Sequence, residues 1–592
     1  MRFHVRSHVR SRVCSASGVS ASVVTALAIC ATPLSAQDTT ATTSARAALG
    51  PRCNGETISM VIVTRQEPVI VERSTWWSRP VLRFLLSGAP TRVSAVEPFL
   101  LVRQGAACTE TLLAESERVL RAQPYLADAR AVVTPDSSGT VVVSFSTVDD
   151  IRTIVGLGVK DNKPTRLKLG SGNVAGYGML ATLQWQQGFA FRDGWAARFS
   201  DYHVLGKPYL FDGQLERSPL GQVIAGSLSA PLYSQIQRFA WSATYADVDG
   251  YQTFVRGEDI DPLSLEVSRR SWALNAVYRF AGNSTRTSYG LFAGAQIGAD
   301  RIATADEGVV ITEQGFVADP DTTLGPRYST QDRPLIAAIL GARALSFFKA
   351  TSFDALEGAQ DVGRGMQFGS LIGRGFGSDN NGWFVGSQIY AGAGTPRSFV
   401  GLQSNVETSR SDGEWADLIT EGRLAWYYRP TRRRTQIASV EFAGGWNTSI
   451  PMQLQLGTNR VGIRGYEGSK TAGGRRAVAR LEERLIFPGF KKYMGFGGAA
   501  FVDAGKMWAG DVPFGNTVNP RVGAGVGLIF AVPRSSRVNL RVDVAGPLVP
   551  DPGAHWGVNF TITSGRLRFW RPASDLTRAR LAAQAPVVFG WP

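Results

Sequence analysis

Histidine and cysteine are scarce in this sequence, with four residues of each among 592. Beyond residue 36 only His203, His555, Cys53 and Cys108 are left. Neither histidine has a cysteine or a second histidine close to it in the sequence, so the spacing that ligates zinc is missing. A G-x-S-x-G nucleophile motif is missing too. We therefore expect no catalytic site, no metal site and no cofactor.

Long hydrophobic runs are also absent. No uninterrupted apolar segment reaches about 18 residues, the length that a membrane-spanning helix needs. Residues 19–29 form a short apolar run, which follows several arginines and precedes small residues at 33–36. A basic start, a short apolar run and a small-residue cleavage site are typical of a secretory signal peptide. We predict such a signal over residues 1–36.

Acidic residues are too few to balance the basic ones, and the formal charge is +15. Four arginines and no acids fall in the predicted signal, so the remainder carries 15 − 4 = +11. A positive balance often indicates nucleic-acid binding, but a secretory address argues against that partner. We expect the basic side chains to face a polar lumen, a periplasmic partner or anionic lipid headgroups, and composition does not choose among these.

Cys53 and Cys108 form an even pair in a compartment that permits disulfides. They are a possible disulfide, and two unpaired thiols are the alternative. The surrounding segment, residues 53–150, is predicted to be a small α+β domain after a Thr/Ala/Ser-rich linker at 37–52. Its expected elements are a strand at 58–63, helices at 76–86 and 110–122, and a hairpin of strands at 129–134 and 140–147.

From about residue 151 the chain alternates apolar and polar residues in short segments. One example is the segment 537–544, where Val538, Leu540 and Val542 alternate with Asn539 and Arg541. A strand face of charged residues cannot enter a protein core without a large desolvation cost. No helices follow that could cover a soluble sheet, so we predict an all-β transmembrane barrel over 151–570, with apolar side chains toward lipid and no open edge. A soluble β-protein is the alternative.

Other details of the barrel are expected as follows. The first strand lies near 153–160 and the last near 556–563, and between 14 and 19 segments could be strands. Residues 300–334 are predicted to contain one long acidic loop. Residues 571–592 continue past the barrel as a C-terminal tail. The alternating glycines of 523–527 predict a lumen face that requires small side chains rather than a phosphate-binding loop.

The segment 457–505 carries the most specific motif. Ile463, Arg464, Gly465 and Tyr466 lie in a glycine-rich loop, and two predicted strands follow it. The first strand carries Glu482 and the second carries Phe501 and Asp503. Period-two alternation places Glu482 with Arg480 and Arg484 on the polar side, whereas Glu483 interrupts the apolar side. We therefore expect Glu482 to point into the lumen.

These motifs resemble the BamA/TamA superfamily of outer-membrane barrels (the bacterial surface antigen family), which has a V/I-R-G-F/Y loop and an F-x-D-x-G strand. Residues 105–150 are similar to a POTRA domain, with a helix, a Pro-Tyr-Leu segment and a hairpin. The resemblance implies about 16 antiparallel strands, one periplasmic POTRA-like domain, and a lock in which Arg464 pairs with Asp503 and Glu482 and stacks on Phe501. The alternative is that these charges only solvate the lumen wall.

The resemblance also implies a function. The POTRA-like domain would receive unfolded outer-membrane or secreted proteins by strand addition, and a weak seam between first and last strands would open laterally. The barrel would then assist insertion of outer-membrane proteins or translocation across the outer membrane, with lipid and periplasmic or lipoprotein factors as further partners. The alternative is a passive barrel, namely a porin, adhesin or surface antigen. Secretion of one dedicated partner is a third possibility.

Overall fold

The computed structural model describes residues 53–66, 89–160, 163–189, 192–257, 260–283, 288–376, 382–411, 413–457, 462–487 and 494–564, together with Leu576. The predicted signal peptide, the linker at 37–52 and the helix at 76–86 lie outside the described residues. The tail at 571–592 does so too, apart from Leu576. No helix within the described ranges is long and apolar enough to cross a membrane.

The first described part is a small α+β domain. Its sheet has the order β2-β1-β4-β3, in which β1 and β4 run parallel and β3 and β4 form a hairpin. The elements are β1 (Asn54–Gln66), the 3-10 turns η4 (Val93–Ala95) and η5 (Glu97–Phe99), β2 (Ala107–Thr109), α3 (Glu110–Ala122), β3 (Leu126–Pro135) and β4 (Val141–Asp149).

Local sequence signals explain the bounds of α3. The hydroxyl of Thr109 accepts a hydrogen bond from the backbone N–H of Leu112 at 3.3 Å, which satisfies one of the free donors at the helix start. Pro124 follows just after the last turn and cannot continue a helix. Val119 and Leu120 face the sheet and are fully buried against Phe145 and its neighbours. The helix therefore occupies the predicted residues 110–122.

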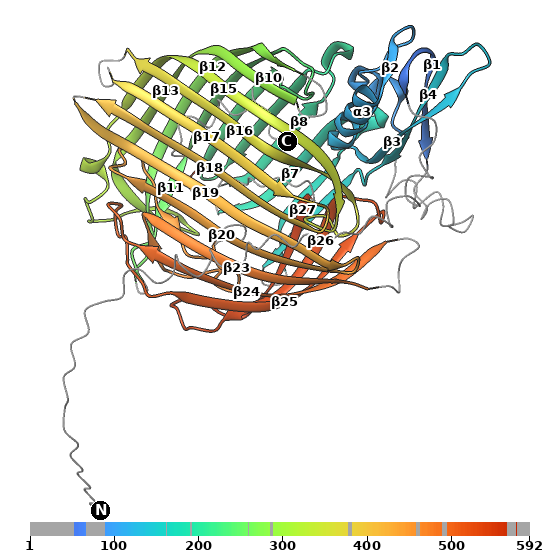
Figure 1. Ribbon diagram of the computed structural model, residues 1–592. Helices are drawn as coiled ribbons and strands as arrows, with labels where there is room; N and C mark the ends of the chain where they lie inside the picture. Colours follow the sequence, from blue (N-terminus) through green and yellow to red (C-terminus); the bar gives the residue numbers. More distant parts are fainter. Residues whose placement is uncertain are drawn as a thin grey trace, which may run out of the picture. The chain divides into compact units, whose positions relative to one another are not determined.

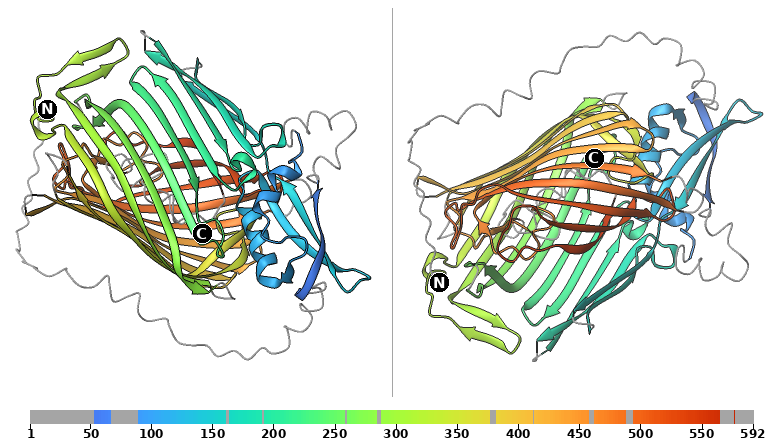
Figure 2. Two further views of the ribbon diagram at one scale, coloured as in Figure 1. Left: turned by 90° about the horizontal axis from the view of Figure 1, so that it is seen from above. Right: turned by 90° about the horizontal axis from the view of Figure 1, so that it is seen from below.

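The rest of the chain forms a closed barrel of about 20 strands (Figure 1, Figure 2). In chain order they are β5 (Thr153–Lys160), β6 (Lys163–Ser171), β7 (Met179–Phe189), β8 (Arg192–Asp201), β9 (Leu210–Ser218), β10 (Gly221–Ala230), β11 (Phe239–Phe254), β12 (Leu263–Asn283), β13 (Ser288–Thr312), β15 (Gln331–Thr351), β16 (Ala359–Gly375), β17 (Trp383–Gly394), β18 (Ser398–Ser411), β19 (Glu414–Thr431), β20 (Arg434–Trp446), β23 (Arg475–Ile486), β24 (Gly495–Trp508), β25 (Arg521–Ala531), β26 (Val538–Pro547) and β27 (Gly557–Ser564).

Three short elements and three further 3-10 turns lie in the connections between these strands. They are β14 (Gly315–Ala318), β21 (Leu454–Gln455), β22 (Ala472–Gly473), η6 (Val174–Gly176), η7 (Val204–Gly206) and η8 (Gly325–Arg327). β14 folds back on β13 as a short flap, whereas β21 and β22 pair with each other inside a long loop.

The two faces of the wall confirm the predicted alternation. On β26, Leu540 and Val544 are about 44% and 43% exposed, whereas Asn539 and Asp543 are buried. The same pattern holds on β12, where Leu274 is exposed and its neighbours are covered. Outward apolar and inward polar side chains are the arrangement of a transmembrane barrel. The predicted fold class, an all-β barrel preceded by a small α+β domain, is therefore correct.

The number of strands differs from the implied 16. Strands β5 to β10 have only 8 to 11 residues each. Residues 219–220 alone connect β9 to β10, whereas the longer segments 172–178 and 202–209 connect β6 to β7 and β8 to β9. Because the strands themselves are short, this part of the chain holds more strands than a uniform length predicts. The family number was carried over with the resemblance and did not take these short strands into account.

The predicted acidic loop within 300–334 is shorter than expected and covers only 313–330, where the short strand β14 also lies. β13 continues through Asp300 to Thr312, and β15 begins at Gln331. Asp300 faces inward and pairs with Arg269 on β12, with Nε and Oδ1 2.7 Å apart. An acidic residue here marks a lumen-facing strand position, because a barrel interior accepts charges that a soluble core would reject.

The wall of the barrel has unequal height. The strands β12, β13 and β15 have 21, 25 and 21 residues, whereas β5 and β27 have 8 each. β27 lies next to β5 in the ring, so the first and last strands close the barrel where its wall is shortest. A strand residue adds about 3.3 Å of length, so the difference exceeds the thickness of a headgroup layer.

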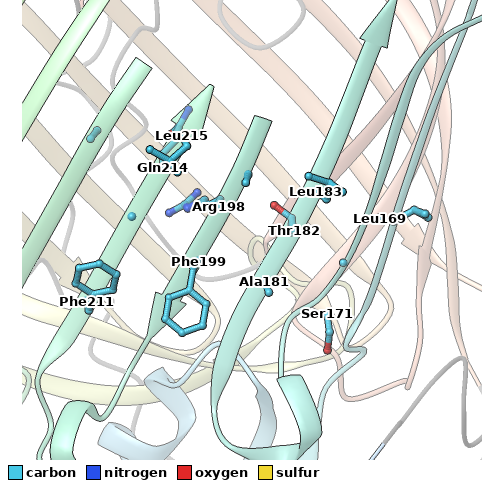
Figure 3. A pocket seen from close by; sticks show the side chains of 14 residues that line it. Leu169, Ser171, Ala181, Thr182, Leu183, Arg198, Phe199, Phe211, Gln214 and Leu215 are labelled. Atoms are coloured by element: carbon cyan, nitrogen blue, oxygen red, sulfur yellow. The ribbon is translucent and has the colours of Figure 1, made fainter. Parts of the chain in front are cut away.

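The outward face next to this closure is hollowed (Figure 3). The hollow, of about 750 Å³, lies over the small residues Ala181, Ala197 and Gly213. Larger side chains surround it, among them Phe199 and Phe211, whose ring centroids are 6.2 Å apart. Its lining is almost entirely apolar, as expected for a surface that faces acyl chains.

The small domain contacts the ends of barrel strands through charged groups. Arg121 of α3 forms two hydrogen bonds with Asp361 of β16, at 2.8 and 2.7 Å. Burial opposes the charged form of this guanidinium, but hydrogen bonds and charge from Asp361 and Glu117 outweigh that effect and raise the pKa of Arg121. Arg537 donates to the carbonyl of Leu126 at 2.6 Å. The domain is therefore held at a fixed side of the barrel.

A disulfide joins Cys53, just before β1, to Cys108 of β2, across a sequence separation of 55. Peptide mapping without reductant should recover one joined peptide from the purified protein. Reduction should lower the free energy of unfolding of the small domain by roughly 3–4 kcal/mol, because the unfolded chain regains its loop entropy. Two separately alkylated thiols in the unreduced protein would contradict the bond.

Candidate functional site in the barrel lumen

The connection between β20 and β23, residues 447–474, folds into the lumen. Its apolar side chains form a small core with the barrel wall, in which Met452, Leu454 and Leu456 are fully buried. Ile463 and Tyr466 belong to the same cluster, and the β21–β22 pairing stiffens the base of the loop. Residues 458–461 lie outside the described ranges. Burial of this apolar set favours the inward position of the loop.

Arg464 stands at the centre of a charged cluster below that core. Its Nε and Nη2 donate to the two carboxylate oxygens of Asp503 at 2.8 and 2.7 Å. Its Nη1 donates to Glu482 at 2.6 Å, and its backbone N–H donates to Asp503 at 3.1 Å. The guanidinium carbon lies 3.5 Å from the ring centroid of Phe501. One planar side chain thus makes a bidentate pair, a second ion pair and a cation–π contact.

Strand register explains why the partners meet. On the paired strands β23 and β24, Glu482 lies opposite Phe501, and Arg480 lies opposite Asp503. These positions all point inward because alternate residues share a face. Glu483 instead lies on the outward face, where it pairs with Arg434. Only the first of the two adjacent glutamates can therefore reach Arg464.

Further arginines share the carboxylates of Arg464. Arg541 of β26 donates to Glu482 at 2.8 Å and pairs with Asp543 at 2.7 Å. Nε of Arg484 donates a hydrogen bond to Oε1 of Glu482. Arg480 pairs with Glu441 of β20 at 2.7 Å and donates to the carbonyl of Gly462 at 2.7 Å. We name these residues the lock network: Arg464, Arg480, Arg484, Arg541, Glu441, Glu482, Asp503 and Asp543.

Glycines make room for the loop against β25 and β26. A Cβ atom at Gly523 would lie 2.3 Å from the carbonyl oxygen of Arg464, and one at Gly525 would lie 2.5 Å from the Phe501 ring. Gly465 has a φ of +87° and approaches Gly546 so closely that a Cβ would lie 2.6 Å from its nitrogen. Larger residues at these positions would push the arginine away from its carboxylates. The alternating glycines of β25 thus provide the small-residue face that the sequence predicts.

Tyr466 fixes the far side of the loop. Its side chain is fully buried, and its hydroxyl lies 3.0 and 2.6 Å from the carbonyl oxygens of Val522 and Val549. Ile463 packs closely against Gly505 of β24. The network and its loop together connect β23, β24, β25 and β26, which are the four strands before β27.

A second inward segment lies below the network. The turn between β15 and β16, residues 352–358, places Phe353 in an aromatic cluster with Tyr427, at 5.1 Å between ring centroids. Arg484 donates to the carbonyl of Phe353 at 2.8 Å, and Asn539 donates to that of Asp354 at 2.8 Å. Arg484 therefore links this turn to Glu482 and to the lock network. The turn and the loop narrow the lumen from two ends.

Sequence reasoning missed several of these residues. It placed Arg480, Arg484 and Arg541 on polar strand faces but assigned none of them a partner, and it overlooked Glu441 and the inward turn. Alternation in the sequence shows that these arginines lie on the polar face of a strand. Their ion-pair partners depend on strand register and on the curvature of the barrel wall. A signal that could have been used is the run of inward arginines itself, which requires carboxylates nearby.

The two remaining histidines take no part in this site. His203 lies 3.0 Å from Asp201 beside a turn, and His555 lies against the carbonyl of Gly553. Among the described residues, no group of His, Cys, Asp and Glu side chains is arranged to hold a metal ion.

The chain is similar in structure to BamA, which gives its name to the BamA/TamA superfamily that the sequence motifs resemble. The BamA structure, from Haemophilus ducreyi and lacking POTRA domains 1–3, has 11% sequence identity and a TM-score of 0.38, with 85% of this chain and 84% of that chain covered. CdiB from Acinetobacter baumannii has 10% sequence identity and a TM-score of 0.40, with 86% of this chain and 74% of that chain covered. CdiB from Escherichia coli has 13% sequence identity and a TM-score of 0.38, with 89% of this chain and 92% of that chain covered. No protein-family model and no curated protein matches the sequence.

The lock network makes a stability prediction. Arg464→Ala or Asp503→Ala should lower the thermal unfolding midpoint of the barrel while its β-content stays similar. Removal of one partner leaves buried charges without compensation, at a cost of roughly 3–5 kcal/mol. The midpoint is measured by heat-modifiable gel mobility and by circular dichroism.

Glu483→Ala is the matched control, because it breaks an outward ion pair that is worth at most about 1 kcal/mol. Its midpoint should stay close to that of the native protein. Native midpoints in both Arg464→Ala and Asp503→Ala would mean that these charges only solvate the lumen wall.

Proposed function

We propose that this protein is an outer-membrane barrel that assists the insertion of other outer-membrane proteins or their translocation across that membrane. The observation that carries the proposal is the contrast between two neighbouring parts of the wall. Strands β23 to β26 are held together by the lock network, whereas the adjacent closure between β27 and β5 is short. A barrel built in this way opens at one place and keeps its shape elsewhere.

The closure lacks side-chain support of its own. Within the described side chains of β5 and β27, none makes a hydrogen bond or an ion pair across the barrel. Gly156 and Gly158 offer β5 little packing, while Leu157, Phe560 and Ile562 are more than 60% exposed on the outward face. Main-chain hydrogen bonds join β27 to β5 in the closed ring. A client strand can replace those bonds with equivalent ones, so exchange at the seam has a low net cost.

The short wall supports the same function. Hydrophobic mismatch thins a bilayer next to a short apolar span, and β5 to β10 are much shorter than β12 to β15. A thinner bilayer beside the seam reduces the distance over which a client must bury its polar main chain before it is paired. The apolar hollow over Ala181 and Gly213 lies on this same low part of the wall.

The small domain supplies strand edges for a POTRA-like role, and the two edges differ. On β3, the backbone N–H of Ala131 donates to Glu117 at 2.7 Å, and the carbonyl of Ala129 accepts from Arg121 at 3.0 Å. Side chains of α3 thus already occupy that edge. β1 pairs with β4 along one edge, and along its other edge β2 covers only the first residues, with no further described strand on that side. We therefore place the addition of an unfolded segment on β1.

A passive barrel is the alternative, since the lock network would also stabilise a porin or a surface antigen. The inward loop and the turn at 352–358 weigh against an open porin, because both occupy the lumen. Nothing in the assembly mechanism requires an enzyme activity, a cofactor or nucleotide hydrolysis, since folding of a barrel into a membrane is downhill.

Reconstitution tests the proposal. The purified protein in liposomes should accelerate the folding of a urea-unfolded small outer-membrane protein, followed by its gel shift. Empty liposomes and liposomes with an unrelated barrel should show the slow, uncatalysed rate. Arg464→Ala should fold the client more slowly than the native protein, because its wall beside the seam is less rigid. Equal rates with native protein and unrelated barrel, for several clients, would favour the passive barrel.

A further inference from the structure

A band of tryptophans and basic residues follows the outward face of the barrel, at the strand ends away from the small domain. On β17, β18 and β19, Trp383 lies opposite Arg410, and Arg410 lies opposite Trp415. The guanidinium carbon of Arg410 is 5.7 Å from the ring centroid of Trp415. Both tryptophans are about half exposed. The three residues therefore form a continuous row across neighbouring strands, which Figure 1 shows side by side.

The row continues on β20, β23 and β24. Arg475 lies opposite Trp508 in register, and its guanidinium carbon is 4.8 Å from the ring centroid of Trp446. The ammonium of Lys506 is 5.3 Å from the ring centroid of Trp508. Alternation places these residues on the same side as the exposed Val502, which faces outward. We call the seven residues of the two rows the Arg/Trp band.

The cations of the band are not neutralised by the protein. Within the described ranges, Arg410, Arg475 and Lys506 have no carboxylate partner, and Nε of Arg475 is shielded from solvent without an acceptor. Acids do occur in the nearby loops at Glu414 and Asp511, but neither forms an ion pair with the band. Cation–π contacts hold the charged groups against rings while leaving N–H groups free for another acceptor.

The neighbouring part of the wall, from β11 to β15, is built differently. There Arg270 of β12 pairs with Asp247 of β11 at 2.9 Å, and Arg301 of β13 lies opposite Asp332 of β15. Each of these outward arginines thus faces an acid of the protein itself. Arg410 and Arg475 differ from these two arginines, because no carboxylate pairs with them in the described part of the chain.

We propose that the Arg/Trp band binds the phosphate groups of anionic lipid headgroups. Tryptophan favours the boundary between acyl chains and headgroups, which places the cations beside it at the depth of lipid phosphates. Guanidinium groups donate paired hydrogen bonds to phosphate oxygens. Charge complementarity selects an anionic headgroup over a zwitterionic one, whose own cation would meet Arg410 and Arg475. The lipid is held along β17 to β24, on the side of the barrel that carries the lock.

Native mass spectrometry with two lipids tests this inference. The detergent-solubilised full-length protein is given equimolar phosphatidylglycerol and phosphatidylcholine, and the ratio of the two lipids that stay bound is measured. Substitution Arg410→Gln/Arg475→Gln/Lys506→Gln should lower that ratio at least about fivefold, since each cation near a headgroup layer changes the partition by roughly that factor.

Two further variants separate lipid binding from general effects. Arg270→Gln/Arg301→Gln/Arg434→Gln removes the same charge from outward arginines that face acids, and its ratio should stay close to native. Arg410→Lys/Arg475→Lys keeps the charge and should also retain most of the preference. An equal loss in the first of these variants, a full loss in the second, or an unchanged ratio in the glutamine band variant would each overturn the proposal. The result is independent of any insertase activity.

Discussion

The burial of Arg464 against Asp503 and Glu482 is the interaction on which the interior of this barrel depends. A guanidinium in a partly dry lumen is tolerated only when carboxylates and a ring surround it. Those partners come from β23 and β24, and the space for them comes from glycines on β25. Glu482 is shared by Arg464, Arg484 and Arg541, which belong to three different parts of the chain. One carboxylate thus fixes a loop, its own strand and a strand three positions further along the wall.

Because several arginines share Glu482, loss of this acid should disturb the network more than loss of one arginine. Loss of Glu482 leaves three guanidinium groups without their common acceptor, whereas loss of Arg541 leaves Glu482 with two remaining donors. The network therefore depends more on its acids than on its bases. It ends at β26, so β27 gains no support from it beyond its main-chain pairing. The proposed seam therefore begins where the buried charges of the lock network stop.

The sequence alone was informative wherever period-two alternation or a local cap determines the structure. Alternation separated Glu482 from Glu483 and predicted the outward face of β26, and the cap at Thr109 with Pro124 bounded α3. Prediction from the sequence failed where the lengths of strands and loops depend on tertiary contacts. Asp300 was assigned to a loop, whereas it lies on β13, where Arg269 on the neighbouring strand pairs with it. Strand number failed for a related reason, since hairpin length is not encoded in alternation.

The basic composition can now be assigned to places in the structure. Only nine of the 63 basic residues are lysines, so 63 − 9 = 54 are arginines. Arginine is the side chain that can pair bidentately and stack at the same time. In the lumen Arg464 stacks on Phe501 while it binds carboxylates of the protein. On the outer face Arg475 stacks on Trp446 but meets no described carboxylate. The arginine–ring contact in the lumen is thus completed by carboxylates of the protein, whereas we propose that lipid phosphates complete the one on the outer face.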